Sequence, residues 1–230
     1  MPFSRDPLHS KPSQLSKSII HASDSIGNPF FTIWFQPAGT VREALETGNH
    51  DPEALLAVLF GLSLSLLPAA YEAVPFEFSP MLYGMRIGII GAALGGILLY
   101  TIPALLHWTG SWLGGDADSF ETRCAYGWSL LPMVCILAIG LPLLLRLGEG
   151  LYHPPRGWAQ TAPWLLYGVH AYHYLENAAC LWTTCLLIAG LREVHHFTWW
   201  KGAVCLALAL FLLGIPAAGV IVACRLALGV

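Results

Sequence analysis

Long apolar segments separated by short polar ones make up most of the chain after residue 50. They cover residues 54–71, 82–107, 124–145, 163–190 and 202–224. A helix of about 20 apolar residues crosses the roughly 30 Å hydrocarbon core of a bilayer. The pattern therefore predicts an all-α membrane protein, a bundle of five transmembrane helices with an N-terminal interfacial helix, whose membrane domain is formed by residues 51–230.

The first 50 residues follow a different pattern. Residues 1–27 are polar, carry Ser and Pro throughout, and lack the apolar core of a signal peptide, so we expect a disordered cytoplasmic tail. In residues 28–50 the aromatic run NPFFTIWF precedes Pro37, and Thr40 and Glu43 have the spacing of a capping box. These features predict an interfacial amphipathic segment with one or two short helices, ended by Gly48. A plain amphipathic linker is the alternative.

Composition agrees with a membrane protein and excludes a nucleic-acid partner. Of the 230 residues 56% are hydrophobic and 11% are charged, and the mean hydropathy is +0.60. The net charge is -3 and the basic residues form no run, so no nucleic-acid surface is expected. The six cysteines lie in or beside apolar segments without a C-x-x-C pair, which is typical of small buried side chains. A cytoplasmic N-terminus places seven of the 11 basic residues inside, as the positive-inside rule favours.

The fourth apolar segment carries polar residues through its middle. Spacings of three and four place them on one side of a helix, with Glu176 beside them. Such groups are costly in lipid, so we expect them to face protein or a wet cavity. The stripe consists of His170, His173, Asn177, Cys180 and Thr184.

Three interpretations of His170, His173, Glu176 and Asn177 remain open. The first is a proton or cation site within the membrane, and the second is a divalent metal site with imidazole and carboxylate ligands. One helix supplies too few ligands for a metal, so Glu72, Glu77 or His153 would have to complete the shell. The third is a hydrogen-bond network that only fixes helix packing.

A second polar set lies in the loops predicted for the cytoplasmic side. It could bind zinc or form a pH-sensitive docking surface. The alternative is a histidine pair that anchors the interface beside Trp199 and Trp200. The set consists of His107, Asp116, Asp118, Glu193, His195 and His196.

Small residues repeat every four positions in the second apolar segment. They are Gly84, Gly88, Ala92 and Gly96, with Gly91 and Gly95 beside them. Small residues in this register let a neighbouring helix approach closely, so we expect this stripe to pack helices together.

Three stretches resemble the Yip family, the Ypt-interacting membrane proteins of the secretory pathway and their bacterial relatives. They are NPFFTIWFQPAGTVRE (28–43), LGGDADSFETRCAYGWSLLP (113–132) and LREVHHFTWWKG (191–202). The short N-terminal region is similar to bacterial members, which implies the inner membrane of a bacterium. Ala38 stands where bacterial members often have a basic residue, and the cluster HAYHYLEN is not part of the family pattern.

The resemblance implies Rab GTPase binding and membrane shaping for eukaryotic members, and a protein that organises partners or lipid for a bacterial one. Our first hypothesis is therefore a non-enzymatic scaffold that acts in the lipid bilayer, as a homo-oligomer or with other membrane proteins. The second is a proton or cation channel or transporter that uses Glu176 and His173. The third is a membrane metalloprotein on the same residues. Spacing places no Ser-His-Asp or Cys-His set, so no catalytic residue is assigned.

Overall fold

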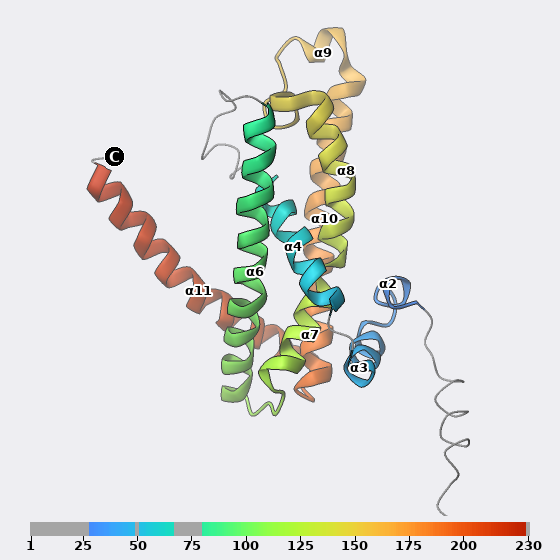
Figure 1. Cartoon of the computed structure of the whole chain (residues 1–230), viewed down its shortest axis with the longest axis vertical. Coiled ribbons are helices and arrows are strands. Elements are labelled where there is room, and N and C mark those ends of the chain that lie inside the picture. Colours follow the sequence, from blue (N-terminus) through green and yellow to red (C-terminus); the bar gives the residue numbers. More distant parts are fainter. Residues whose placement is uncertain (1–27, 49–50, 67–79, 229–230) are drawn as a thin grey trace, which may run out of the picture.

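The computed structural model describes residues 28–48, 51–66 and 80–228 of the chain. Every regular element in these residues is a helix (Figure 1). The elements are α2 (Pro29–Thr32), α3 (Pro37–Thr47), α4 (Asp51–Ser65), α6 (Pro80–Trp112), α7 (Ser119–Ser129), α8 (Leu131–Leu147), the 3-10 helix η1 (Gly148–Leu151), α9 (Trp158–Thr161), α10 (Pro163–Val194) and α11 (Trp199–Leu228).

In the described part of the chain, four segments are long and apolar enough to cross a bilayer, which confirms a helical membrane protein. They are Ile87–Trp112 in α6, Ser119–Leu147 in α7 and α8, Pro163–Val194 in α10 and Trp199–Pro216 in α11. The first predicted span corresponds to α4, which has 15 residues. At about 1.5 Å per residue, α4 is shorter than a hydrocarbon core of roughly 30 Å. The rest of that predicted span, with Glu72 and Glu77, lies outside the described residues.

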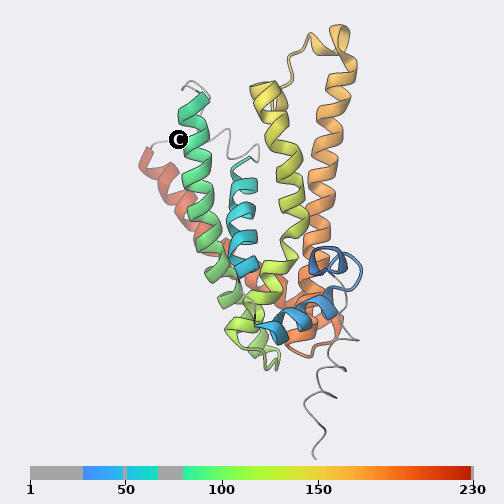
Figure 2. The same cartoon turned by 45° about the vertical axis from the view of Figure 1, so that its right-hand side comes forward.

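The helices form a bundle with α4 in its interior. α4 packs along α6 and α8, whereas α10 packs against α8 and α7 (Figures 1 and 2). α11 contacts α6 near its own start and then diverges from the bundle (Figure 1). The short helices α2 and α3 lie beside the end of the bundle where α7 is found, and α3 contacts both α7 and α10.

The closest helix contact joins α4 and α6, and it uses glycines next to the predicted stripe. A Cβ on Gly95 would lie 2.1 Å from the carbonyl oxygen of Ala57, and one on Gly61 would lie 2.0 Å from the carbonyl oxygen of Gly91. The glycines of the predicted stripe itself do not make this contact. A Cβ on Gly84, Gly88 or Gly96 would meet no described atom within 4 Å, because those positions are turned away from α4.

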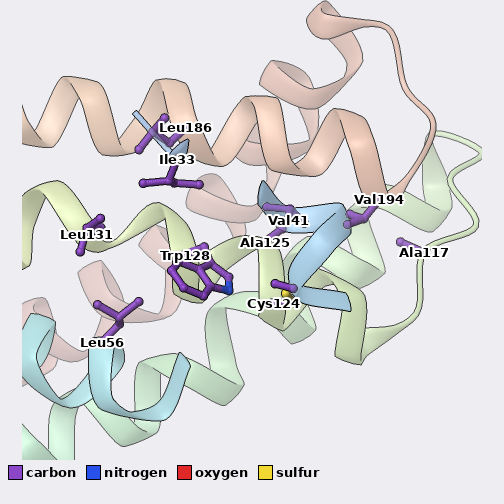
Figure 3. Close-up of a cluster of buried hydrophobic side chains, with 11 residues drawn as sticks. Ile33, Val41, Leu56, Ala117, Cys124, Ala125, Trp128, Leu131, Leu186 and Val194 are labelled. Atoms are coloured by element: carbon purple, nitrogen blue, oxygen red, sulfur yellow. The ribbon is translucent and has the colours of Figure 1, made fainter. Parts of the chain in front are cut away.

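The segment before α4 docks on the end of the bundle through an apolar core. Ile33, Val41 and Ala44 are buried, and they share a cluster with Trp128 of α7 and Val194 of α10 (Figure 3). This is the contact that holds α3 against the two membrane helices. Burying three aliphatic side chains contributes about 25 cal/mol per Å² of apolar surface removed from water.

The helix boundaries of α3 follow from its terminal residues. Gly48 ends α3 in the left-handed region at φ 64°, as predicted. The predicted capping box was wrong, because the helix already begins at Pro37. The hydroxyl of Thr40 lies inside the helix and donates to the carbonyl oxygen of Gln36 at 3.0 Å.

The loop between α6 and α7 is shorter than the apolar pattern predicts. α6 continues to Trp112, and α7 begins at Ser119 because Asp118 caps it. Asp118 Oδ1 accepts from the amides of Phe120 and Glu121 at 2.8 and 2.7 Å, and Glu121 Oε2 accepts from the Asp118 amide at 2.9 Å. α7 and α8 are separated at Leu130, where Pro132 has no amide hydrogen to continue the helix.

Candidate functional site

A cavity of about 460 Å³ lies between α4, α8 and α10, and its polar lining comes from the middle of α10. α4 and α10 both pack on α8, so they face each other across this space. Its lining residues are Phe60 and Leu64 of α4, Met133 of α8, and His173, Glu176, Asn177, Cys180, Thr183 and Thr184 of α10.

The structure brings most of the predicted polar stripe to this one cavity. His173, Asn177, Cys180 and Thr184 line it together with Glu176, because residues three and four apart share a side of the helix. His170 is exposed and does not line the cavity. On α10 the cavity begins one turn later, at His173. The predicted set is therefore brought together without His170.

His173 is held by hydrogen bonds from both of its ring nitrogens. Nε2 lies 3.0 Å from the carbonyl oxygen of Leu151, and Nδ1 lies 3.1 Å from Oε2 of Glu176. Leu151 ends η1, which follows α8 after a turn at Gly148 with φ 53°. A loop that is distant in the sequence thus fixes the orientation of the imidazole in the cavity.

These two contacts determine how many protons the pair carries. A carbonyl oxygen only accepts, so Nε2 of His173 must be the donor to Leu151. Nδ1 and an ionised carboxylate would then be two acceptors facing each other at 3.1 Å, unless a proton lies between them. Glu176 and His173 therefore share one proton, either as carboxylate with imidazolium or as carboxylic acid with imidazole. In both forms the pair has no net charge, which suits a carboxyl group that is 8% exposed.

Three further polar groups of the cavity keep unused hydrogen-bonding capacity. Asn177 donates one amide hydrogen to the carbonyl oxygen of His173 at 2.7 Å, which leaves its second hydrogen and its Oδ1. Thr184 donates to the carbonyl oxygen of Cys180 at 3.0 Å and can still accept. The buried Oγ1 of Thr183 makes no hydrogen bond with the described residues.

The cavity opens at the side of α10. Asn177 and Cys180 are exposed, whereas Glu176 is buried behind them. In Figure 2 α10 lies at the edge of the bundle. The amide of Asn177 is thus accessible, whereas the carboxyl group of Glu176 is buried and the imidazole of His173 is part-buried.

The described residues do not form a metal centre. They contain no group of three or more His, Cys, Asp or Glu side chains that could hold an ion. His153 is not among the residues that line the cavity, and Glu72 and Glu77 lie outside the described residues. The metal interpretation thus has no ligand set in the described part of the chain.

The second predicted set surrounds His195 at the opposite end of α10 from η1. His195 is 2% exposed, and its ring stacks on Phe197 at 4.9 Å. It packs on the backbone, since a Cβ on Gly110 or Gly115 would lie 2.4 Å from the ring. Neither ring nitrogen makes a hydrogen bond with the described residues. Burial, and to a lesser extent the nearby His107, lower the pKa of His195 from 6.5 to about 4, so its ring is neutral at pH 7.

The other members of this set have separate structural roles. His107 Nδ1 lies 2.9 Å from the carbonyl oxygen of Ala117, and Asp118 caps α7. Glu193 binds Arg42 of α3, which sequence reasoning did not anticipate because 151 residues separate them. His196 is exposed and takes a positive φ of 53°. Asp116 lies close enough to His195 to act on its pKa, in the direction opposite to His107. Among the described residues, no three of these side chains form a group that could hold a metal ion.

A buried acidic residue was also missed. Glu53, in the first turn of α4, is 1% exposed, and its Oε2 lies 3.8 Å from Nε of Arg123 in α7. In the sequence Glu53 is typical of the first turn of a helix, where acidic residues are usually exposed. The sequence therefore did not indicate that it is buried. The only signal that could have found the pair is that both residues border apolar spans.

The described residues form a helical bundle with four bilayer-length apolar segments, which defines the chain as an integral membrane protein. The family model of the Yip1 domain matches residues 31–221, and the chain belongs to this family. This match confirms the resemblance of the three sequence stretches. No curated protein and no solved structure matches the chain.

Proposed function

We propose that this Yip1 domain protein is a non-enzymatic membrane scaffold that holds a membrane-embedded partner against the cavity of α10. The observation that carries the proposal is the exposure of Asn177 and Cys180 at the cavity mouth. Asn177 lies near the middle of a 32-residue span. Lipid tails offer no hydrogen bonds there, and a carboxamide left without partners in hydrocarbon is costly. A partner that hydrogen-bonds to Asn177 removes this cost.

The apolar surface of the helices is what a membrane-embedded scaffold requires. Large apolar side chains of α6, α10 and α11 are exposed, as expected for surfaces that meet lipid or other membrane helices. Among them are Ile89 and Ile97 of α6, Leu175 and Leu181 of α10, and Phe211 of α11.

We place α2 and α3 on the membrane surface, and we count α4 together with the apolar sequence that continues to residue 71 as a fifth crossing. Phe31 and Phe35 are 71% and 88% exposed, and Trp199 and Trp200 are exposed at the same end of the bundle, which suits the headgroup region. We propose that this end faces the cytoplasm, because the positive-inside rule favours this orientation, and the family resemblance favours the inner membrane of a bacterium. These residues are Arg42, Arg123, Arg192 and Lys201, with Arg5, Lys11 and Lys17 in the preceding sequence.

Site-specific photo-crosslinking in native membranes tests the scaffold. A photoreactive residue at Leu181, one turn from Asn177, should form a protein adduct that mass spectrometry identifies. The same residue at Leu175 is the matched control, because Leu175 is also exposed but lies about 120° away around α10 from Leu181. Adducts with lipid alone at Leu181, or the same protein adduct at both positions, would contradict the proposal.

A second candidate function, movement of a proton or cation, is favoured by the proton that Glu176 and His173 share. For Glu176→Gln, the conduction hypothesis predicts a different result from the scaffold hypothesis. Conduction through the pair requires a group that releases its proton, so flux into liposomes should be lost in this variant. The scaffold predicts unchanged partner binding and no flux in either protein.

A further inference from the structure

We propose that the partner at the α10 cavity is a second copy of this chain, bound in a parallel two-fold contact centred on Asn177 and Cys180. This inference deepens the proposed function and rests on it. It concerns the chemical nature of the occupant, which the proton count and the geometry of the cavity restrict.

The charge of the site selects a neutral occupant. Glu176 and His173 together carry no net charge, and among the described residues no other carboxyl or basic group lines the cavity. A cationic occupant would have to displace the shared proton, whereas an anionic one would meet no positive charge. A neutral group that both donates and accepts hydrogen bonds fits without any change of protonation.

The free groups of the cavity have the pattern that a carboxamide satisfies. Asn177 offers one hydrogen and Oδ1, and Thr183 Oγ1 still lacks a described partner. Another carboxamide donates and accepts in the same plane, so it can bind Asn177 in both directions. The cavity volume of about 460 Å³ leaves room for side chains, with Phe60, Leu64 and Met133 as its apolar part.

This chain presents such a carboxamide at the required depth. Between residues 50 and 230 its only carboxamides are Gln160 and Asn177, and Asn177 lies in the middle of a span. In a two-fold contact the same patch serves both partners, so Asn177 of one copy meets Asn177 of the other at the same depth. Two copies in the same orientation therefore hold their Asn177 amides at the same depth in the membrane. An unrelated partner need not carry a matching group at that depth.

The remaining residues of the mouth allow two α10 helices to approach. Cys180 and Thr184 follow Asn177 at spacings of three and four, the repeat of a helix–helix seam, and both are small. Because the pair behind Asn177 is neutral, two copies can meet without repulsion between like charges.

The native cysteines provide the test. Two single-cysteine chains, one keeping Cys180 and one keeping Cys185, are expressed in membranes with two different tags. Both sulfurs are exposed on α10, but they lie about 140° apart around the helix. A disulfide requires Cα atoms within about 7 Å, so oxidation with copper–phenanthroline reports which side of α10 lies at the contact.

We expect Cys180 to form a disulfide-linked dimer of the 25.0 kDa chain in a yield several-fold above that of Cys185. In the Cys180 chain, Asn177→Leu should lower this yield several-fold, and Asn177→Gln should restore most of it because the amide is retained. Equal yields at Cys180 and Cys185, no dimer at Cys180, or no effect of Asn177→Leu would each overturn the inference.

The photo-crosslink at Leu181 separates the scaffold proposal from the proposal of a second copy. Because it uses the otherwise unchanged chain, it still works if a single-cysteine chain fails to accumulate. An adduct between two tagged copies supports both. An adduct with a different protein keeps the scaffold and overturns the second copy. An adduct with lipid alone overturns both.

Discussion

Arg42 of α3 donates from Nε and Nη2 to the same carboxylate oxygen, Oε1 of Glu193 at the end of α10, with 2.8 Å between Nε and Oε1. The contact joins the helix that precedes the bundle to the last turn of the helix that carries the cavity. The carboxylate of Glu193 raises the pKa of Arg42, so the guanidinium remains charged. Because Arg42 is largely exposed, the pair positions α3 more than it stabilises the whole fold.

Arg42→Gln should therefore loosen α3 without unfolding the bundle. We expect faster amide hydrogen exchange in residues 37–47 and an unchanged melting temperature, because the apolar contacts of Val41 and Ala44 remain. Glu46→Gln is the comparison, because Glu46 is an exposed acid on the same helix that acts on Arg42 more weakly than Glu193 does, so its removal should have a smaller effect. Exchange in α3 that is the same in the Arg42 variant and the wild type would show that the pair does not hold the helix.

Adjacent glycines of α6 should respond in opposite directions to the same change. Gly95→Ala places a Cβ 2.1 Å from the Ala57 carbonyl oxygen, so α4 and α6 must separate, at a cost of about 1–3 kcal/mol. Gly96→Ala meets no described atom within 4 Å and should stabilise the helix by up to about 1 kcal/mol. Unfolding of both variants in mixed micelles measures the difference. Equal stabilities would mean that the α4–α6 contact is looser than described.

His195 should make folding stability depend on pH below neutrality. Its pKa is lowered to about 4 in the fold, so only the unfolded chain gains the proton as the pH falls through 6.5. Stability should thus decrease between pH 6.5 and 4, with a slope of up to about 1.4 kcal/mol per unit. His195→Phe, which keeps an aromatic ring against Phe197, should flatten this slope in chemical unfolding. His196→Asn removes an exposed imidazole and should leave the slope unchanged; a flat wild-type profile would contradict the assignment.

The shared proton in the cavity can be tested by replacing the carboxyl group with an amide. In Glu176→Gln the amide donates to Nδ1 of His173 in place of the shared proton, so stability should stay close to wild type. Glu176→Ala leaves Nδ1 without this donor and should cost about 1–3 kcal/mol. Thermal unfolding of the two variants compares them directly. If Gln destabilises as much as Ala, the carboxyl group does more than hold one proton.

Sequence periodicity located the polar part of the cavity because all of it comes from one helix. His173, Asn177, Cys180 and Thr184 recur at helical spacing, and Glu176 follows from its position beside them. Periodicity could not show that His170 would lie beyond the cavity, since the end of the cavity is set by α4 and α8. The same limit applies to the glycines of α6, where the four-residue repeat was visible but the side that meets α4 was not.

By itself, the sequence determined that the chain is a helical membrane protein of the Yip1 family, because length and apolar composition decide which segments can enter lipid. The tertiary structure decided which distant groups meet. Leu151 fixes the proton on His173, Arg123 meets Glu53, and Arg42 meets Glu193. These contacts depend on how helices are rotated and placed, which local spacing does not encode. The first of them gives the polar stripe in the cavity a defined charge.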